Sequence, residues 1–227
     1  MTEPCKLSII VPVYNEVKTV ETILQRVRQL NISKEIIAID NVSTDGTREL
    51  LKTIPYIDRL ILQEKNLGKG HSVRAAIPYL KGEYAVIQDG DLEYDPNSFH
   101  EMLALAEKNN YDAVYGSRIR GEVFLSCYVS YYLGVRFLTF MINFLFGGNL
   151  TDSATTYKMV RTSILKKLVF NCDGFDFDFE LTAKILKSGS PIMEIPVPYN
   201  PRSFQEGKKI RAVDGLKSLW AILAARI

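Results

Sequence analysis

The sequence predicts an α/β fold, a mostly parallel sheet with helices on both faces. Strand-like segments alternate with segments of helical apolar spacing through the first half of the chain. The helical segments have the length, about 10–15 residues, that connects neighbouring parallel strands. Polar turns, most of them containing glycine, follow the predicted strands. Because ligands of such sheets bind outside the carboxyl ends of the strands, these turns are where a site is expected.

The predicted elements follow one another in a regular order. Strand-like segments cover 7–13, 34–40, 58–64, 84–91 and 111–118. Segments with helical spacing lie between them, at 17–30, 43–54, 69–80 and 97–109. Ser43 and Thr44 precede the second helix and Asp95-Pro96 precedes the fourth, as is typical of helix starts. After residue 119 the pattern weakens; an aromatic tract at 124–146, a helix-like segment at 177–189 and a strand-like segment at 191–199 follow.

Composition indicates one globular domain, residues 1–227, with a second lobe. The apolar fraction of 47% and the charged fraction of 24% suit a chain with a sizeable core. A net charge of +2, without a long basic block, argues against a nucleic-acid-binding protein. The three cysteines form no CxxC pair, which predicts neither a zinc site nor a disulfide framework and favours a reducing compartment. The N-terminal apolar run is too short for a signal peptide.

The longest apolar tract, residues 128–146, has nearly the length of a membrane span but carries Arg136 at its middle. A charge at the centre of a bilayer costs about 2.5–3.5 kcal/mol on insertion scales. We therefore expect a helix that lies in the membrane interface or packs on a core, rather than one that spans a membrane. A dimer interface explains the same aromatic residues.

Acidic residues gather after the fourth predicted strand, in the stretch QDGDLEYDP. Asp89 and Asp91 flank Gly90, so both carboxylates can lean to one side of the backbone. Hard divalent cations take oxygen ligands, usually one or two carboxylates together with substrate phosphates. A solvated acidic turn is the simpler explanation of an isolated D-x-D. However, the chain has neither a GxGxxG nor a P-loop, so a bound diphosphate would need a metal. Asp95 more plausibly starts a helix.

Seven motifs in order, from Leu7 to about Trp220, resemble those of the family 2 glycosyltransferases of the GT-A fold. They are IIVPVYNE, IDNVSTDGT, NLGKG, QDGDLEYDP, YGSR, TDSATTYKMV and YNPRSFQEGKKIRAVDGLKSLW. More closely, they are similar to the dolichyl- or polyprenyl-phosphate sugar synthases. Two residues depart from the family pattern. Asn41 stands where a second aspartate is common, and Glu93 stands where many relatives have glutamine.

The resemblance implies a function and an architecture. The reaction is metal-dependent, inverting transfer of a glycosyl group from a nucleotide diphosphate sugar, of the GDP-mannose or UDP-glucose type, to a polyprenyl or dolichyl phosphate. The cofactor is Mg²⁺ or Mn²⁺. A Rossmann-like GT-A sheet carries a nucleotide-sugar half at about 1–118 and a smaller acceptor lobe at about 119–227, with an interfacial segment at 124–146. The expected location is cytoplasmic, at the cytoplasmic face of a membrane, through peripheral contact or a membrane partner protein.

The resemblance also assigns roles to individual residues. Those that bind the nucleotide sugar are Pro12, Tyr14, Glu16, Asp40, Asn41, Lys69, Gly70, Asp89, Gly90, Asp91, Arg118, Arg202 and Lys208. Those that hold the metal are Asp89, Asp91 and Glu93. Those that act in catalysis are Asp152, Arg118 and Arg202; the arginines, with Lys208 and Lys209, neutralise the leaving diphosphate and the incoming nucleophile. Arg136 meets the phosphate of a lipid.

Several of these assignments have a structural alternative. Glu16 and Asp40 can cap the helix or turn that follows, and Lys208 can lie in a solvated loop. Asp152 is either a general base or the cap of the next segment; a hydroxyl acceptor needs a base, whereas a lipid phosphate is already charged. No catalytic role is assigned to Asp178 or Glu180, whose aromatic neighbours suggest packing.

Two other functions and several properties stay open. The first alternative is a glycosyltransferase acting on a sugar hydroxyl of a surface polysaccharide or glycan, with Asp152 as base. The second is a nucleotide-sugar-binding module without catalysis. The sequence does not specify the base or sugar of the donor, nor the oligomeric state.

Overall fold

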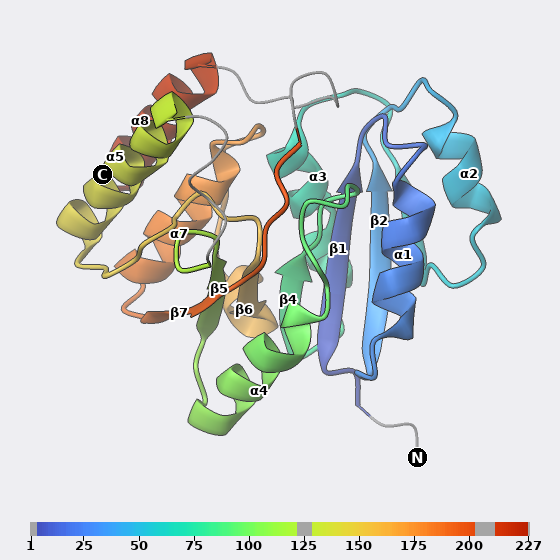
Figure 1. Cartoon of the computed structure of the whole chain (residues 1–227), viewed down its shortest axis with the longest axis horizontal. Helices are drawn as coiled ribbons and strands as arrows, with labels where there is room; N and C mark the ends of the chain where they lie inside the picture. The colour runs from blue at the N-terminus through green and yellow to red at the C-terminus, as the bar shows by residue number, and fades with distance from the viewer. Residues whose placement is uncertain (1–3, 122–128, 203–211, 227) are drawn as a thin grey trace.

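A seven-stranded sheet forms the centre of the computed structural model, which describes residues 4–121, 129–202 and 212–226 (Figure 1). The strands lie in the order β3-β2-β1-β4-β6-β5-β7. Their bounds are β1 Leu7–Val13, β2 Lys34–Asp40, β3 Arg59–Leu62, β4 Tyr84–Ile87, β5 Ala113–Ser117, β6 Lys158–Arg161 and β7 Ile192–Pro196. β6 runs antiparallel to β4 and β5, and the other neighbours are parallel. The predicted α/β class with a mostly parallel sheet is confirmed.

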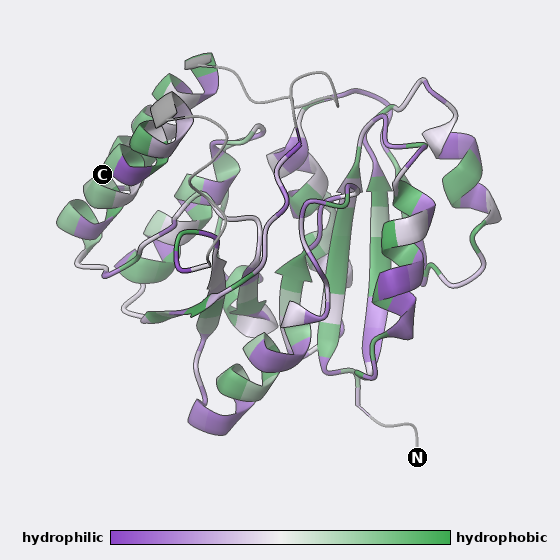
Figure 2. Ribbon diagram, viewed as in Figure 1, coloured by the Kyte–Doolittle hydropathy of each residue, from purple (hydrophilic) through white to green (hydrophobic). Residues whose placement is uncertain are grey.

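Helices cover both faces of this sheet (Figure 1). Their bounds are α1 Val20–Gln29, α2 Thr47–Thr53, α3 Lys69–Ala76, α4 Ser98–Asn109, α5 Val129–Phe146, α6 Thr162–Leu165, α7 Phe177–Lys187 and α8 Ala212–Arg226, with a 3₁₀ turn at Ile77–Tyr79. On one face, α1 and α4 bury Leu24 and Phe99 against β1. On the other, α3 and α7 bury Val73 and Leu181 against the opposite side of the same strands. The middle strands are accordingly hydrophobic along most of their length (Figure 2).

Beside α7 lies a third apolar cluster, formed by two helices from the second half of the chain. α5 and α8 lie side by side and both pack against α7 (Figure 1). Ile142 of α5, Phe179 of α7 and Ile222 of α8 are buried together there. One side of α7 thus faces the sheet and another faces the α5–α8 pair, which explains why a helix with two acidic residues in its first turn is buried along most of its length.

The order of the predicted elements is confirmed, and three further elements appear: β6, the short helix α6 and α8. β6 has only four residues, and the charges of Lys158 and Arg161 at its ends hide its apolar pattern. α8 carries exposed apolar side chains where a surface helix normally carries polar ones, so its amphipathic spacing is blurred. Several predicted strands end earlier than expected; β4, for example, ends at Ile87 and leaves Asp89 and Asp91 in the turn that follows. No described helix is both long enough and apolar enough to cross a membrane.

Two glycines give a matched test of this packing. A Cβ on Gly116 of β5 would lie 2.6 Å from Cγ1 of Val197 and 3.0 Å from Cβ of Tyr157, whereas a Cβ on Gly134 of α5 meets nothing within 4 Å. We expect Gly116→Ala to lower the free energy of unfolding by about 1–3 kcal/mol. Gly134→Ala should raise it by about 0.5–1 kcal/mol, because alanine favours the helix. Urea denaturation followed by circular dichroism measures both; equal effects would contradict this packing.

Candidate active site

Hydrogen bonds connect the turns that follow β1 and β2 at the carboxyl edge of the sheet. The backbone N–H of Asn15 donates to Oγ of Ser43 at 2.9 Å, and that of Glu16 donates to Oγ1 of Thr47 at 2.9 Å. In return, Oδ1 of Asn15 accepts from the N–H of Thr44. Asn15 has a φ of 52°, in the left-handed region that asparagine tolerates. These bonds fix the direction in which the Glu16 side chain leaves the turn.

Asp40 and Asn41 end β2 and are both buried. Oδ2 of Asp40 accepts from Nε of Arg48 at 2.5 Å, and its carboxylate also accepts from the N–H of Ser43. Nδ2 of Asn41 donates to Oδ1 of Asn66 at 2.9 Å. Among the described residues, Oδ1 of Asn41 is buried without a hydrogen-bond partner. A buried acceptor without a partner costs free energy, so this oxygen is suited to accept from a ligand.

Arg202 is the centre of the site. Its guanidinium contacts three carboxylates, those of Glu16, Asp91 and Glu93. NH1 lies 3.0 Å from Glu16 and NH2 lies 2.5 Å from Asp91. The backbone N–H of Arg202 also donates to Glu93 at 2.9 Å, and Oη of Tyr199 donates to the same carboxylate at 2.8 Å. One arginine from the segment after β7 thus neutralises acids from the turns after β1 and β4.

The acidic turn carries more negative charge than one arginine balances. Burial, together with the carboxylates of Asp89 and Glu93, raises the pKa of Asp91 to about 7, against the opposing effect of Arg202. The anionic form of Asp91 is therefore held at a cost. A further cation beside this carboxylate would relieve that cost.

Asp89 faces a different cation. Nζ of Lys69, at the start of α3, lies 2.9 Å from Oδ1 of Asp89 and donates to Oγ1 of Thr156 at 3.0 Å. The hydroxyl of Thr156 donates to Oδ2 of Asp89 at 2.7 Å. Burial opposes the charge of Lys69, but the carboxylates of Asp178 and Asp89 outweigh it and raise the pKa of Lys69 above its usual range. Asp89 and Lys69 form a charged pair at the edge of the site.

The residues of this turn fit a divalent cation by their chemistry. Asp89 and Asp91 supply carboxylate oxygens, the ligands that Mg²⁺ and Mn²⁺ prefer. The guanidinium of Arg202 already places one positive charge against Asp91. In the described part of the chain, no three acidic, histidine or cysteine side chains converge as a ready cage. Glu93, expected as a third ligand, instead turns toward Tyr199 and Arg202. Two carboxylates completed by substrate phosphates are the mode of binding that remains.

Asp152 and Arg118, both expected in catalysis, are bound to each other in the structure. The Asp152 side chain is fully buried, with Oδ2 at 2.7 Å from Nε of Arg118 and Oδ1 at 2.8 Å from NH2. Its backbone N–H donates to Glu194. A carboxylate that holds a buried arginine through two hydrogen bonds is a poor base. The side chain of Arg118 is only 4% exposed, against 21% for Arg202, so it is also less accessible to a diphosphate. We assign this pair to the packing of β5 against the 150–153 segment.

Gly70, expected to bind the nucleotide sugar, also has a partner within the protein. Its N–H donates to the carbonyl of Gly174 at 3.3 Å, so it does not point to a phosphate. A Cβ at this position would lie 2.6 Å from the carbonyl oxygen of Cys172. The glycine is required by the close approach of the 172–174 segment to α3 rather than by a ligand.

The other expected residues are spread over several places. Pro12 lies within β1, and Tyr14 follows that strand with a partly exposed ring. The carbonyl of Gly90 accepts from Oγ1 of Thr19 at 2.9 Å. Arg136 is exposed on α5. Lys208 and Lys209 lie outside the described residues, so their expected contact with the diphosphate stays a prediction.

Sequence reasoning missed three polar or charged residues beside the site, two in contact with expected residues and one in contact with Asp178. They are Thr156, Lys158 and Asp178, from the segment before β6, from β6 and from the first turn of α7. A lysine inside the apolar stretch TTYKMV was the available signal, because a charge within a buried strand requires a partner.

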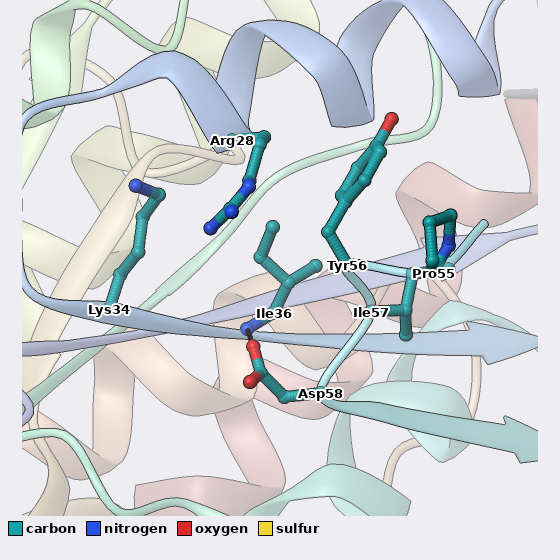
Figure 3. Close-up of a pocket in the computed structure, with 7 residues that line it drawn as sticks. All are labelled: Arg28, Lys34, Ile36, Pro55, Tyr56, Ile57 and Asp58. Atoms are coloured by element: carbon teal, nitrogen blue, oxygen red, sulfur yellow. Dashed lines mark hydrogen bonds between the residues drawn. The ribbon is translucent and has the colours of Figure 1, made fainter.

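A surface hollow lies far from this site. Arg28, Lys34 and Tyr56 line it, with the turn at 55–58 (Figure 3). Lys34 begins β2 and Asp40 ends it, so the hollow lies at the amino ends of the strands. Ligand sites in parallel sheets lie at the opposite edge.

Fold and site together define the class of protein. A mostly parallel sheet with an antiparallel β6 and acidic turns at its carboxyl edge is the GT-A fold of glycosyltransferases. Glucosyl-3-phosphoglycerate synthase from Mycobacterium tuberculosis, solved in complex with UDP, superposes with a TM-score of 0.73 and 18% identity over 98% of this chain and 80% of that one. The Staphylococcus aureus protein TarS, residues 1–349, in complex with UDP-GlcNAc, covers 97% of this chain and 66% of its own with a TM-score of 0.66 and 17% identity.

The family described as glycosyl transferase family 2 matches residues 8–169, and the chain belongs to that family. Glycosyltransferase AglJ of Haloferax volcanii is 27% identical over 89% of this chain and 65% of its own length. Dodecaprenyl-phosphate galacturonate synthase of Rhizobium johnstonii is 27% identical over 72% of this chain and 50% of its own. The chain thus spans between about half and two thirds of these relatives.

A structural role of Asp152 as the partner of Arg118 can be tested by measuring stability. Asp152→Asn leaves the buried guanidinium of Arg118 without its counter-charge, so the free energy of unfolding should fall by about 3 kcal/mol or more. Arg118→Met/Asp152→Leu removes both charges and should cost clearly less than the sum of Arg118→Met and Asp152→Leu measured singly. Urea denaturation measures the unmodified protein and these four variants. An Asp152→Asn protein of unchanged stability that has lost glycosyl transfer would restore Asp152 as the base.

Proposed function

We propose that the chain transfers a glycosyl group from a nucleotide diphosphate sugar to a polyprenyl phosphate, with inversion at the anomeric carbon. Membership of family 2 supports glycosyl transfer. The choice of acceptor depends on one observation: each described carboxylate of the site lies against a cation. The pairs are Glu16, Asp91 and Glu93 with Arg202, Asp89 with Lys69, Asp152 with Arg118, and Asp178 with Lys69 and Lys158.

These pairs favour an acceptor that is already ionised. A sugar hydroxyl must lose a proton to a general base as it attacks, and a nearby cation weakens the affinity of a carboxylate for that proton. Asp91 is the exception, because burial and its acidic neighbours raise its pKa to about 7, and this carboxylate is assigned to the metal. A phosphate monoester carries its negative charge before it arrives. It needs cations that position it and no base. Two similar proteins are named as a dodecaprenyl-phosphate synthase and an undecaprenyl-phosphate transferase, which agrees with this choice.

The donor would lie across the carboxyl edge of the sheet. Its base would reach the end of β2, where Asn41 offers an unpaired acceptor oxygen to a base N–H. Its diphosphate would lie near Asp89 and Asp91, which would hold Mg²⁺ or Mn²⁺ between the protein and the phosphates. The bound ion would neutralise charge on the leaving diphosphate. Structural neighbours of the same fold have been solved with Mn²⁺ and UDP.

Arg202 and Lys69 would act on the same diphosphate as fixed cations. An oxygen of the acceptor phosphate forms a bond to the anomeric carbon while the bond from that carbon to the donor diphosphate breaks. The nucleoside diphosphate leaves with the electron pair. Cations positioned beforehand where this charge develops can lower the barrier by several kcal/mol. Loading of the donor would also draw Arg202 away from some of its three carboxylates.

The α5–α8 pair supports contact with a membrane surface. The exposed apolar side chains are Leu133, Phe137, Phe140 and Phe144 on α5, and Val213, Leu216, Trp220 and Leu223 on α8. On each helix they recur every three or four residues and form one stripe. Contiguous exposed apolar patches mark interaction surfaces. The exposed Arg136, Lys217 and Arg226 on the same helices suit anionic headgroups.

The direct test is glycosyl transfer from a panel of nucleotide sugars, including GDP-mannose and UDP-glucose, to a short polyprenyl phosphate. Label should enter the lipid phase with one of these donors in the presence of Mn²⁺ or Mg²⁺. A chelator should abolish the transfer, because Asp89 and Asp91 would no longer bridge to the diphosphate. Donor binding without lipid product would refute polyprenyl phosphate as the acceptor. Absence of donor binding would refute the proposed transfer reaction.

The membrane contact is tested separately. Phe144→Ser/Trp220→Ser removes two of the most exposed apolar side chains and should weaken binding to anionic phospholipid vesicles by about tenfold or more, since each buried aromatic contributes about 1.5–3 kcal/mol. Val169→Ser is the matched control, because Val169 is equally exposed but lies outside α5 and α8. Vesicle flotation measures both. Equal binding by the double variant and the control would exclude this surface.

A further inference from the structure

Four charged side chains of alternating sign form a row that leads from the core to the candidate active site. Lys158 of β6 lies 3.1 Å from Oδ1 of Asp178, in the first turn of α7. Oδ2 of Asp178 lies 3.6 Å from Nζ of Lys69. Nζ of Lys69 lies 2.9 Å from Asp89, the residue after β4 that would bind the metal. Four separate segments of the chain each supply one charge.

Burial changes steadily along this row. The side chain of Lys158 is fully buried, that of Asp178 is 8% exposed, that of Lys69 is 11% exposed and that of Asp89 is 24% exposed. The inner end is also held by uncharged groups. Nζ of Lys158 donates to the carbonyl of Ser153 at 3.0 Å and lies 5.4 Å from the ring of Tyr115. Only the outer end is therefore within reach of a ligand.

Asp178 is held as an anion by both of its neighbours. Burial alone would raise its pKa, but Lys158 and Lys69 outweigh this and hold the pKa of Asp178 below its usual range. Burial lowers the pKa of Lys158 to about 8, although Asp178 opposes the shift. Because each carboxylate oxygen faces a lysine, Asp178 is unsuited to take a proton from an acceptor.

We propose that Asp178 is a positioning residue that holds the ammonium of Lys69 at the donor diphosphate. This inference rests on the proposed function and gives a role to a residue for which the sequence suggested only packing. Lys69 is shared by two carboxylates, Asp89 at the surface and Asp178 behind it. When Asp89 engages a loaded donor, Asp178 still holds Lys69 in place. The charge of Lys69 then acts on the leaving diphosphate, because Asp89 no longer pairs with Lys69.

A buried ion pair that contributes only to stability is the competing explanation. Under that explanation, Asp178 only neutralises Lys158. Loss of the Asp178 charge then lowers the stability of the fold without changing the position of Lys69. Asp178→Asn alone does not separate the two cases, because it leaves the fully buried Lys158 without a counter-charge. The test therefore uses a background in which that charge is removed. Lys158→Met keeps Asp178 for Lys69, and Asp178→Asn is then added to it.

The experiment is a double-mutant cycle between Lys69 and Asp178 in the Lys158→Met background. Calorimetry measures the affinity for UDP and for GDP in the presence of Mn²⁺, transfer assays give kcat and KM, and thermal unfolding reports stability. Lys158→Met alone should change affinity and kcat/KM by no more than about threefold. Adding Asp178→Asn should lower kcat/KM by about 30-fold, an apparent interaction of about 2 kcal/mol. Adding Lys69→Gln instead should lower it by a similar factor.

The triple variant decides the question. If Asp178 acts through Lys69, the two losses are not additive, and the triple variant falls less than about threefold below either double variant. Additive losses, or a fully active Lys158→Met/Asp178→Asn protein of lowered stability, would overturn the proposal. Absence of transfer by the unmodified protein would count against the proposed function alone, because the cycle can still be completed on nucleotide affinity.

Discussion

The contact of one guanidinium, that of Arg202, with the carboxylates of Glu16, Asp91 and Glu93 is the interaction on which the site depends. A parallel sheet brings the carboxyl ends of its strands to one edge, so acids that follow different strands come close together and repel one another. Arg202 compensates this charge from the segment after β7, which crosses the edge of the sheet (Figure 1). Asn200 reinforces the crossing through a 2.8 Å backbone hydrogen bond to Glu93.

The same principle of compensation extends through the second half of the chain. Arg118 neutralises Asp152 beneath β5, and Lys158 and Lys69 neutralise Asp178 beneath the acidic turn. Charges that are buried must be paired, and each pair joins elements that are distant in sequence. Catalytic chemistry is thereby restricted, because a paired carboxylate is a poor proton acceptor. An enzyme built in this way is suited to a nucleophile that brings its own negative charge, such as a phosphate monoester.

The sequence was sufficient for the fold class and for the acidic turn at the end of a strand, because alternating apolar patterns and polar strand ends are local properties. The turn at Asp89 and Asp91 was predicted from the nine residues QDGDLEYDP. Pairings across the fold were not predictable. Asp152 and Gly70 are motif residues whose partners, Arg118 and the carbonyl of Gly174, lie far along the chain. β6 was not predicted because the fully buried Lys158 makes a core strand resemble a surface segment. α8 was not predicted because its exposed apolar side chains obscure its amphipathic spacing.

The central claim is that the acceptor supplies the negative charge that the paired carboxylates do not generate. The most direct measurement offers the unmodified protein, with its preferred donor and Mn²⁺, two acceptors of the same chain length, a polyprenyl phosphate and the corresponding polyprenol. The account predicts transfer to the phosphate and at least about a thousandfold lower kcat/KM for the alcohol, since no base is available to it. Comparable rates on both acceptors would show that a carboxylate of the site leaves its cation and acts as a base, which would contradict the account.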